Sequence, residues 1–535
     1  MRRVIAVCFV LLLAGSAVGP PVAAAPVGPA QADSPVQTRA QSESPVRAQT
    51  QAEASDGVTV RPSGNEPIGR VNGYWHNDSI AVDQSDGLNE SEMEAYVSRS
   101  MARVEHLRDR KFKEPVPVTV VSRDEFRRES AERQSNETFG AWNNQVWEAL
   151  FIVGRSNDAQ DELGSTYGES VAGYYSPSDD EIKIVSDSPD RPTVDNATLV
   201  HELTHAMQDQ YYDLSDSRYA GETQDGELAA DGVVEGEANY VEARYAERCW
   251  AEWECVPRRG GAGGGSPPNL GILLTIFQPY SDGPAYVHER YREGGWAAVD
   301  AAFADPPVST EQTIHRTDEK PVPIEYEDRA RNGWRTFPDQ GENGSDTAGE
   351  ASIYAMFWYQ ARQYGADTID PQGLLRNAGR YSTYNYDAAP SNGWGNDRLF
   401  PYRKGSGDDA KYGYVWVTEW DTARDAKEFR DAYLAILDAH DAAAAGGGVR
   451  VVEDGPFADA FRVTRDGTRV TIVNGPTPAA VKDIRPAASE ADPASEKPAP
   501  LGDGTGVSLP GFGAPAAVAA LIAAAAVAVA RSRRR

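Results

Sequence analysis

The chain has 535 residues, of which 81 are acidic and 52 basic, and its formal net charge is −29. Binding to nucleic acid needs a basic face for the phosphates, so this balance argues against a nucleic-acid partner. It predicts an acidic, solvated surface of the kind that stays soluble in high salt; an acidic metal-binding matrix is the alternative. The length allows about two to four domains or one large elaborated domain.

The first 25 residues have the three parts of a secretory signal peptide. Arg2 and Arg3 precede an apolar run from Val4 to Leu13, and small residues follow as far as Ala25. The paired arginines point to twin-arginine export, and a short buried helix is the alternative. Residues 26–67 are rich in Pro, Gln, Ser and Ala, so we expect a disordered spacer.

Residues 68–165 form a region of mixed pattern, for which we expect both helix and strand. A helix is predicted from Asn89 to Leu107, and the alternating run 116–121 predicts a strand. Two further apolar runs, 171–175 and 181–185, flank a Ser-Pro-Ser-Asp-Asp turn and predict a hairpin.

The segment that carries most of the chemistry follows this hairpin, where residues 198–207 read TLVHELTHAM. His201 and His205 are four residues apart, so on a helix both side chains project from one face. Two imidazoles at this spacing can bind one zinc ion, and Glu202 is placed to activate a water molecule. We therefore predict a helix over 198–212 with a zinc site on it.

A zinc site of this kind needs a third protein ligand and one open position for water. A second predicted helix, 227–248, offers Glu235 and Glu237 in the string DGVVEGEANY. Their side chains point about 200° apart on a helix, so only one of them can be the ligand. Asp231, one turn before Glu235, is either a residue that orients a ligand histidine or a solvated acid.

Three cysteines are present, and Cys8 lies in the predicted leader. Cys249 and Cys255 have five residues between them and outside the cell would form a disulfide; two free thiols are the alternative. Five Asn-x-Ser/Thr triplets, at positions 77, 89, 136, 196 and 343, are candidate glycosylation sites. Asn196 lies just before the metal-binding helix and is alternatively its cap.

The C-terminal end has its own organisation. Residues 475–509 are rich in Pro, Ala and acids and predict an extended stalk. A Pro-Gly-Phe motif at 510–512, an apolar segment at 514–530 and terminal arginines follow. This order resembles the sorting signal of archaeal surface proteins processed by archaeosortase, in which the tail is cleaved and replaced by a lipid. A plain membrane anchor is the alternative.

The metal-binding segments resemble those of gluzincin-type zinc metallopeptidases, in which the glutamate before glycine in Glu-Gly-x-Ala-x-Tyr binds zinc. The resemblance implies Glu235 as the third ligand. A broader resemblance, over about 165–430, is to uncharacterised zincin-like proteins of bacteria and archaea. It rests on GYYSP at 173–177, HELTHAMQDQ at 201–210, VEGEA at 234–238, DPPVSTEQ at 305–312 followed by His315, and GWGNDR at 393–398.

Zinc peptidases stabilise a developing oxyanion with a His or Tyr side chain. His315 is a candidate catalytic residue for this role, and structural packing is the other interpretation of it. Tyr174, Tyr175 and Tyr240 are further candidates for the same role.

The sequence as a whole predicts an α+β fold with a zincin-like core at 166–320, a mixed α/β region at 321–474 and a sorting signal at 510–535. We expect a haloarchaeal protein that is secreted, anchored at the cell surface and active as a Zn²⁺-dependent peptidase on peptides or proteins. The alternative is a surface or adhesion protein with a structural or vestigial zinc site.

Overall fold

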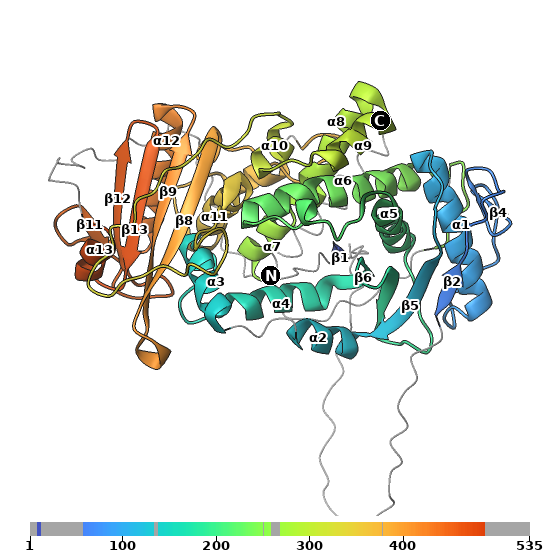
Figure 1. Ribbon diagram of the computed structural model, residues 1–535, viewed down its shortest axis with the longest axis horizontal. Helices are drawn as coiled ribbons and strands as arrows, with labels where there is room; N and C mark the ends of the chain where they lie inside the picture. The colour runs from blue at the N-terminus through green and yellow to red at the C-terminus, as the bar shows by residue number, and fades with distance from the viewer. Residues whose placement is uncertain are drawn as a thin grey trace, which may run out of the picture.

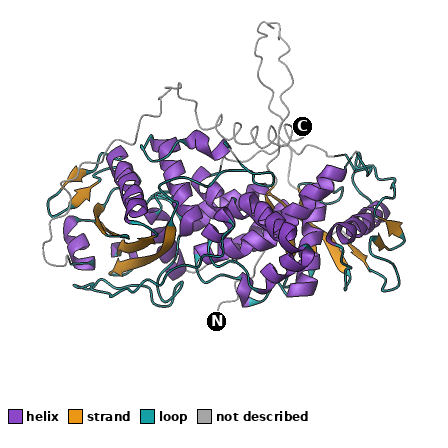
Figure 2. Cartoon of the chain, turned by 90° about the horizontal axis from the view of Figure 1, so that it is seen from above, coloured by secondary structure: helices purple, strands orange, loops and turns teal. Residues whose placement is uncertain are grey.

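The computed structural model describes residues 8–11, 57–132, 137–249, 251–257, 268–376 and 378–486. It is an α+β structure, with 44% helix and 18% strand, as the sequence predicts. Two β-sheets lie at opposite ends of an elongated molecule, and helices fill the space between them (Figures 1 and 2). The segment with His201 and His205 lies on α5, which packs against the first sheet and against α6.

The first sheet has five strands in the order β1-β6-β7-β5-β2. β5 and β7 are parallel, whereas every other neighbouring pair is antiparallel. A separate hairpin pairs β3 with β4. The strand bounds are β1 Cys8–Leu11, β2 Val58–Val60, β3 Arg70–Val71, β4 Tyr74–Trp75, β5 Val116–Ser122, β6 Val171–Ser176 and β7 Glu181–Ser186.

The two faces of this sheet are covered by different helices, because side chains alternate along a strand. Tyr175 and Ile184 lie in one core with residues of α1 and α5, whereas Tyr174 and Val185 pack with Phe126 of α2 on the opposite face. The helices of this half are α1 Glu90–Arg108, α2 Arg123–Glu132, α3 Glu137–Ala149, α4 Ala159–Ser170 and α5 Asn196–Tyr212.

The central helices form around α6, which runs for 25 residues. α8 packs along α6 and crosses it where Gly236 meets Gly283. A Cβ atom on Gly236 would lie 2.6 Å from the backbone of Gly283, so the two glycines permit this close approach. The bounds are α6 Gln224–Arg248, α7 Leu270–Ile276, α8 Gln278–Gly294, α9 Trp296–Ala304, α10 Thr310–His315 and α11 Gly349–Tyr364.

The second sheet is antiparallel throughout, with the order β10-β11-β12-β13-β9-β8. Trp416 on one face joins the core formed with α11 and α12, and Val417 on the other face packs with α13. The bounds are β8 Trp394–Lys404, β9 Lys411–Trp420, α12 Ala423–Ala439, β10 Ala443–Ala444, β11 Val449–Val451, β12 Ala460–Asp466, β13 Arg469–Gly475 and α13 Pro478–Ile484.

The predicted local elements agree closely with these bounds. The helix expected from Asn89 is α1, with a capping box between Asn89 and Glu92, and the expected strand and hairpin are β5, β6 and β7. The helix cap was predicted wrongly, because Asp195 caps α5. The Asn196 side chain instead donates to the Val256 carbonyl and accepts from the Tyr245 hydroxyl.

One strand lies inside the predicted spacer, and one helix lies inside the predicted stalk. Val58 and Val60, inside the predicted spacer 26–67, are buried as β2 against β5. Val481 and Ile484, inside the predicted stalk 475–509, are buried on one face of α13. Each segment has only two large apolar residues to bury. Two residues are too few to give a detectable hydrophobic period within a mostly polar segment.

The predicted leader and C-terminal signal fall mostly outside the described residues. Within the leader, residues 8–11 are described and form β1, whose backbone pairs with β6. The apolar segment 514–530 is not among the described residues. Among the helices that the structure describes, none is both long enough and apolar enough to cross a membrane.

Candidate metal centre

The first half of the candidate site lies on α5. This helix begins after Asp195, whose carboxylate accepts from the Ala197 amide, and it runs without a break to Tyr212. Its apolar side, including Leu199 and Leu203, packs in the core beneath the first sheet. His201 and His205 are one turn apart and almost wholly buried, at 1% and 0% exposed.

The second half is Glu235, which α6 brings to the two imidazoles. Its Oε2 atom lies 3.0 Å from His201 Nε2 and 3.3 Å from His205 Nε2. A tetrahedral zinc site with bonds of about 2.0–2.1 Å places its ligand atoms roughly 3.3 Å apart. The ligand atoms of the three side chains all lie within 4.8 Å of one another. The three predicted ligands therefore converge with spacing that fits a zinc ion.

Each imidazole has a polar side chain near the nitrogen that faces away from Glu235, and that of His205 lies within hydrogen-bond distance. His205 Nδ1 lies 2.8 Å from Gln208 Oε1, and His201 Nδ1 lies 3.6 Å from Glu242 Oε2. Each partner favours a proton on Nδ1 and leaves a lone pair on Nε2, which is the form that binds a metal. Gln208 is itself fixed, since its amide donates to the Val234 carbonyl at 2.9 Å.

Glu202 lies beside the first ligand and is fully buried. Neither carboxylate oxygen makes a hydrogen bond of ordinary geometry with the described residues. Burial raises the pKa of Glu202 to about 8, and the charge of His201 and the backbone amide of Tyr175 offset part of this rise. A buried carboxylate without a partner is costly, so this group has free capacity for a polar ligand at the site.

The electrostatics of the cluster favour one added positive charge. Burial lowers the pKa of His201, but hydrogen bonds to Glu235 and Glu242 outweigh it and raise the value to about 10. Burial also raises the pKa of Glu235, but the two imidazoles outweigh it and lower the value to about 2. The carboxylates thus hold a proton on a ligand histidine, a charge that a cation would replace.

The rejected alternative for the third ligand, Glu237, has another function in the fold. It forms a buried ion pair with Arg108 of α1 and accepts from the Gln208 amide at 3.0 Å. Arg108 and Arg110 both pair in turn with Asp300 of α9. Glu237 therefore ties α6 to α1 and α9, and it stabilises the glutamine that orients His205.

His315 lies at the end of α10 and contacts a different buried acid. Its Nε2 is 2.9 Å and 3.0 Å from the two carboxylate oxygens of Glu350 on α11. This ion pair holds two helices together, and no interaction of His315 with the three metal-cluster residues is present among the described residues. The contacts favour the structural alternative, and the oxyanion role of His315 stays a prediction.

The other candidate residues are engaged elsewhere or lie beside the cluster without a hydrogen bond to it. The Tyr175 hydroxyl donates to Asp209 at 2.7 Å, and the Tyr240 hydroxyl lies 3.1 Å from His288 Nδ1. Tyr174 packs with Phe126 on the far face of the sheet. Asp231 is half-buried near Glu235, but the orienting partners of the ligand histidines are Gln208 and Glu242.

Three residues at the site were missed at the sequence level. Gln208 and Glu242 have a detectable signal, because they follow His205 and Glu235 by three and seven residues, on the same helix faces. Tyr280 of α8 has no such signal, because only the fold brings it there. Its ring lies parallel to the His201 imidazole, with centroids 6.4 Å apart.

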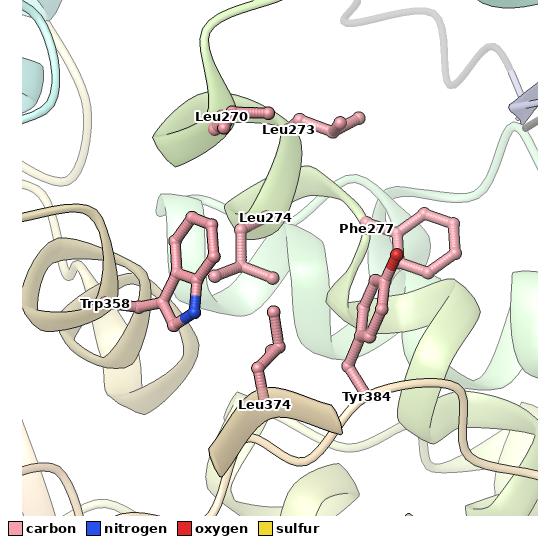
Figure 3. A pocket seen from close by; sticks show the side chains of 7 residues that line it. All are labelled: Leu270, Leu273, Leu274, Phe277, Trp358, Leu374 and Tyr384. Atoms are coloured by element: carbon pink, nitrogen blue, oxygen red, sulfur yellow. The ribbon is translucent and has the colours of Figure 1, made fainter. Parts of the chain in front are cut away.

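A small apolar cavity lies next to Tyr280. Phe277 lines this cavity, and its ring stacks on the ring of Tyr280 with centroids 5.8 Å apart. Figure 3 shows the seven side chains around this cavity, with Leu274, Leu374 and the rings of Trp358 and Tyr384 pointing inward. Its volume of about 20 Å³ is enough for one water molecule and too small for a substrate side chain.

Comparison with known proteins gives one match, in the C-terminal part of the chain. Residues 335–485 match a family model described as a domain of unknown function (DUF8575). This match covers α11, the second sheet, α12 and α13. No curated protein matches the chain, and no solved structure matches it.

Proposed function

We propose that this chain is a zinc-dependent peptidase of the gluzincin type, with a zincin-like core built from the first sheet, α5 and α6. The observation that carries the proposal is the convergence of His201, His205 and Glu235 beside a buried glutamate that has no hydrogen-bond partner of ordinary geometry. A purely structural zinc site has no use for Glu202, whereas hydrolysis needs a general base within reach of the attacking water.

In this proposal His201, His205 and Glu235 hold the zinc ion. Zinc bound by three protein ligands lowers the pKa of a water molecule toward about 7. Glu202 would take the proton of the attacking water and, when the carbon–nitrogen bond breaks, return it to the departing amine.

The position of β6 supports a peptide as the substrate. This strand carries Tyr175, whose backbone amide faces Glu202 closely enough to lower its pKa. Within the described part of the chain, the one partner of β6 on its outer side is the short segment 8–11, and that pairing is antiparallel. An extended peptide in place of this segment would gain main-chain hydrogen bonds and lie alongside the base.

A structural zinc site is the second candidate, and one observation favours it. The four side chains of the centre are between 0% and 2% exposed, and the cavity next to Tyr280 is too small for a substrate. Catalysis therefore requires that β6 or α8 move enough to admit a peptide, whereas a structural site requires no movement.

The test is cleavage of a quenched-fluorescent peptide library by zinc-loaded protein in molar salt. We expect cleavage that a chelator abolishes and that one equivalent of zinc restores. Bound zinc at one equivalent without cleavage of any peptide would contradict the proposal and favour the structural candidate.

The proposal extends to the location of the protein. The Cys249–Cys255 disulfide supports export, since such bonds persist outside the reducing cytosol. We propose that the protein is secreted and held at the surface by its C-terminal segment or by a lipid added by archaeosortase. Mass spectrometry of surface-extracted protein should find no residues beyond about 514, and recovery of the terminal arginines would contradict processing.

A further inference from the structure

A second group of carboxylates lies apart from the candidate metal centre, where α10 approaches the second sheet. Glu311 belongs to α10, Glu319 to the loop after it, and Asp421 to the turn between β9 and α12. One oxygen from each of the three lies within 4.8 Å of the others. Glu319 and Asp421 are exposed, whereas Glu311 is only 5% exposed.

Glu311 is unusual among its neighbours because its charge has no partner. Its Oε2 atom is buried and accepts no hydrogen bond from the described residues. In contrast, Thr310 on the same helix donates to Asp225 at 2.6 Å. No Lys or Arg in the described part of the chain forms an ion pair with any of the three carboxylates. A buried, unpaired carboxylate is expensive to maintain.

Other carboxylates near Glu311 add negative charge around it. Burial, and then the charges of Glu350, Glu319 and Asp421, raise the pKa of Glu311 to about 8. The charge of His315 offsets part of this rise, but both oxygens of Glu350 already contact its Nε2.

The backbone holds these carboxylates in place. The Val322 amide donates to the Gly395 carbonyl at 2.9 Å, and the Asp421 amide donates to the Gly393 carbonyl at 2.9 Å. A Cβ atom on Gly395 would lie 3.6 Å from both Asp421 Oδ1 and a methyl carbon of Val322. The loop and the turn therefore lie against the same end of β8, and the site is formed without rearrangement of the chain.

We propose that Glu311, Glu319 and Asp421 bind a calcium ion that joins α10 to the second sheet. An all-oxygen set with two exposed members suits Ca²⁺, which takes six to eight oxygen ligands and accepts water for the remainder. Zn²⁺ favours nitrogen and sulfur, and Mg²⁺ demands a stricter octahedron. The ion would neutralise Glu311 and fix the loop after α10 to the domain of unknown function. This proposal does not depend on the peptidase proposal.

The test is calorimetric titration of the zinc-loaded full chain with Ca²⁺, together with thermal unfolding at each concentration. We expect one calcium site with a dissociation constant on the order of 10⁻⁴–10⁻³ M, as in extracellular modules, and a higher midpoint when calcium is bound. The double variant Glu319→Gln/Asp421→Asn changes only exposed side chains, so it should fold and bind at least about tenfold more weakly. Glu453→Gln/Asp454→Asn, an exposed acidic pair elsewhere, is the control and should titrate as wild type.

Two further variants separate this site from the zinc site and from general instability. Glu311→Gln removes the unpaired buried charge, so it should raise the unfolding midpoint without calcium and abolish the response to calcium. His201→Ala should lose zinc yet keep the calcium response. Absence of calcium binding, equal binding by the Glu319→Gln/Asp421→Asn variant and wild type, or loss of the response in His201→Ala would each overturn the assignment.

Discussion

At the scale of single residues, the candidate centre depends on two carboxylates of α6, Glu235 and Glu237, that have different contacts. Glu235 and Glu237 are two positions apart and both buried, but one faces the imidazoles and the other faces Arg108. The sequence shows through helix geometry only that one of the two can be the ligand, and it points to Glu235 through the resemblance to gluzincins. It gives no information on Arg108, which is distant along the chain and contacts α6 only in the folded state.

Glu235→Ala should therefore lose zinc, because two imidazoles alone hold the ion poorly. Glu237→Gln should keep zinc at one equivalent and lose stability instead, since it removes one of the two charged partners of the buried Arg108. Metal analysis and unfolding of both variants check this pair. The third ligand would have to be reassigned if Glu237→Gln lost the metal and Glu235→Ala retained it.

Glu242 tests whether the orientation of His201 matters. Its carboxylate lies 3.6 Å from His201 Nδ1, and partners of this kind typically contribute about 10–100-fold to metal affinity. Glu242→Ala should weaken zinc binding by that factor in a competition titration with a chromophoric chelator. Glu247→Ala, on an exposed part of the same helix, is the matched control and should leave zinc affinity unchanged.

At the scale of elements, the crossing of α6 and α8 controls the position of Glu235. Gly236→Ala would place a methyl group 2.6–2.9 Å from the backbone of Gly283, where neither helix can yield. We expect a loss of about 1–3 kcal/mol in the free energy of unfolding, and weaker zinc binding, because the preceding residue, Glu235, is the proposed third ligand. Gly373→Ala, whose Cβ would meet nothing within 4 Å, is the control for the loss of a glycine.

A stabilised Gly236→Ala protein would contradict this packing, because alanine is otherwise favoured over glycine inside a helix by up to about 1 kcal/mol. Chemical denaturation of both variants shows whether each substitution raises or lowers the free energy of unfolding.

The elements themselves were largely predictable, whereas their limits and some contacts were not. Capping residues and apolar periodicity indicated α1, β5, the β6–β7 hairpin and α5, because these signals are local. β2 escaped detection because it pairs with β5, which is distant along the chain, and α13 because it is short and packs on β13, β12 and β9 of the folded sheet. His315 was assigned to catalysis for a similar reason, as its partner Glu350 is 35 residues further along the chain.

At the scale of the whole molecule, a buried acid pair joins the helical part to the second sheet. Glu148 of α3 and Asp459, just before β12, are both almost fully buried, and Arg155 lies 2.8 Å from Asp459. They line a polar cavity of about 670 Å³. Burial, together with the neighbouring carboxyl group, raises the pKa of Glu148 above its ordinary value of 4.5.

This pair predicts how stability depends on pH. The folded protein binds the proton of Glu148 more tightly than the unfolded chain does, so the free energy of unfolding should fall as pH rises above about 4.5. Glu148→Gln should reduce that slope and leave the protein more stable than wild type at alkaline pH. Denaturation at a series of pH values checks this, and an unchanged slope in the variant would show that Glu148 ionises normally.

If Glu202 is the general base of the proposed zinc peptidase, Glu202→Gln should remove activity and leave the metal in place. The measurement is peptide turnover and zinc content of wild type and variant, side by side in molar salt. The amide has nearly the same shape and is not a ligand, so zinc should stay at one equivalent. Turnover should fall by about 10²-fold or more, since the general base is lost. Equal turnover of the two proteins, each with zinc bound, would contradict the assignment of Glu202 as the catalytic base.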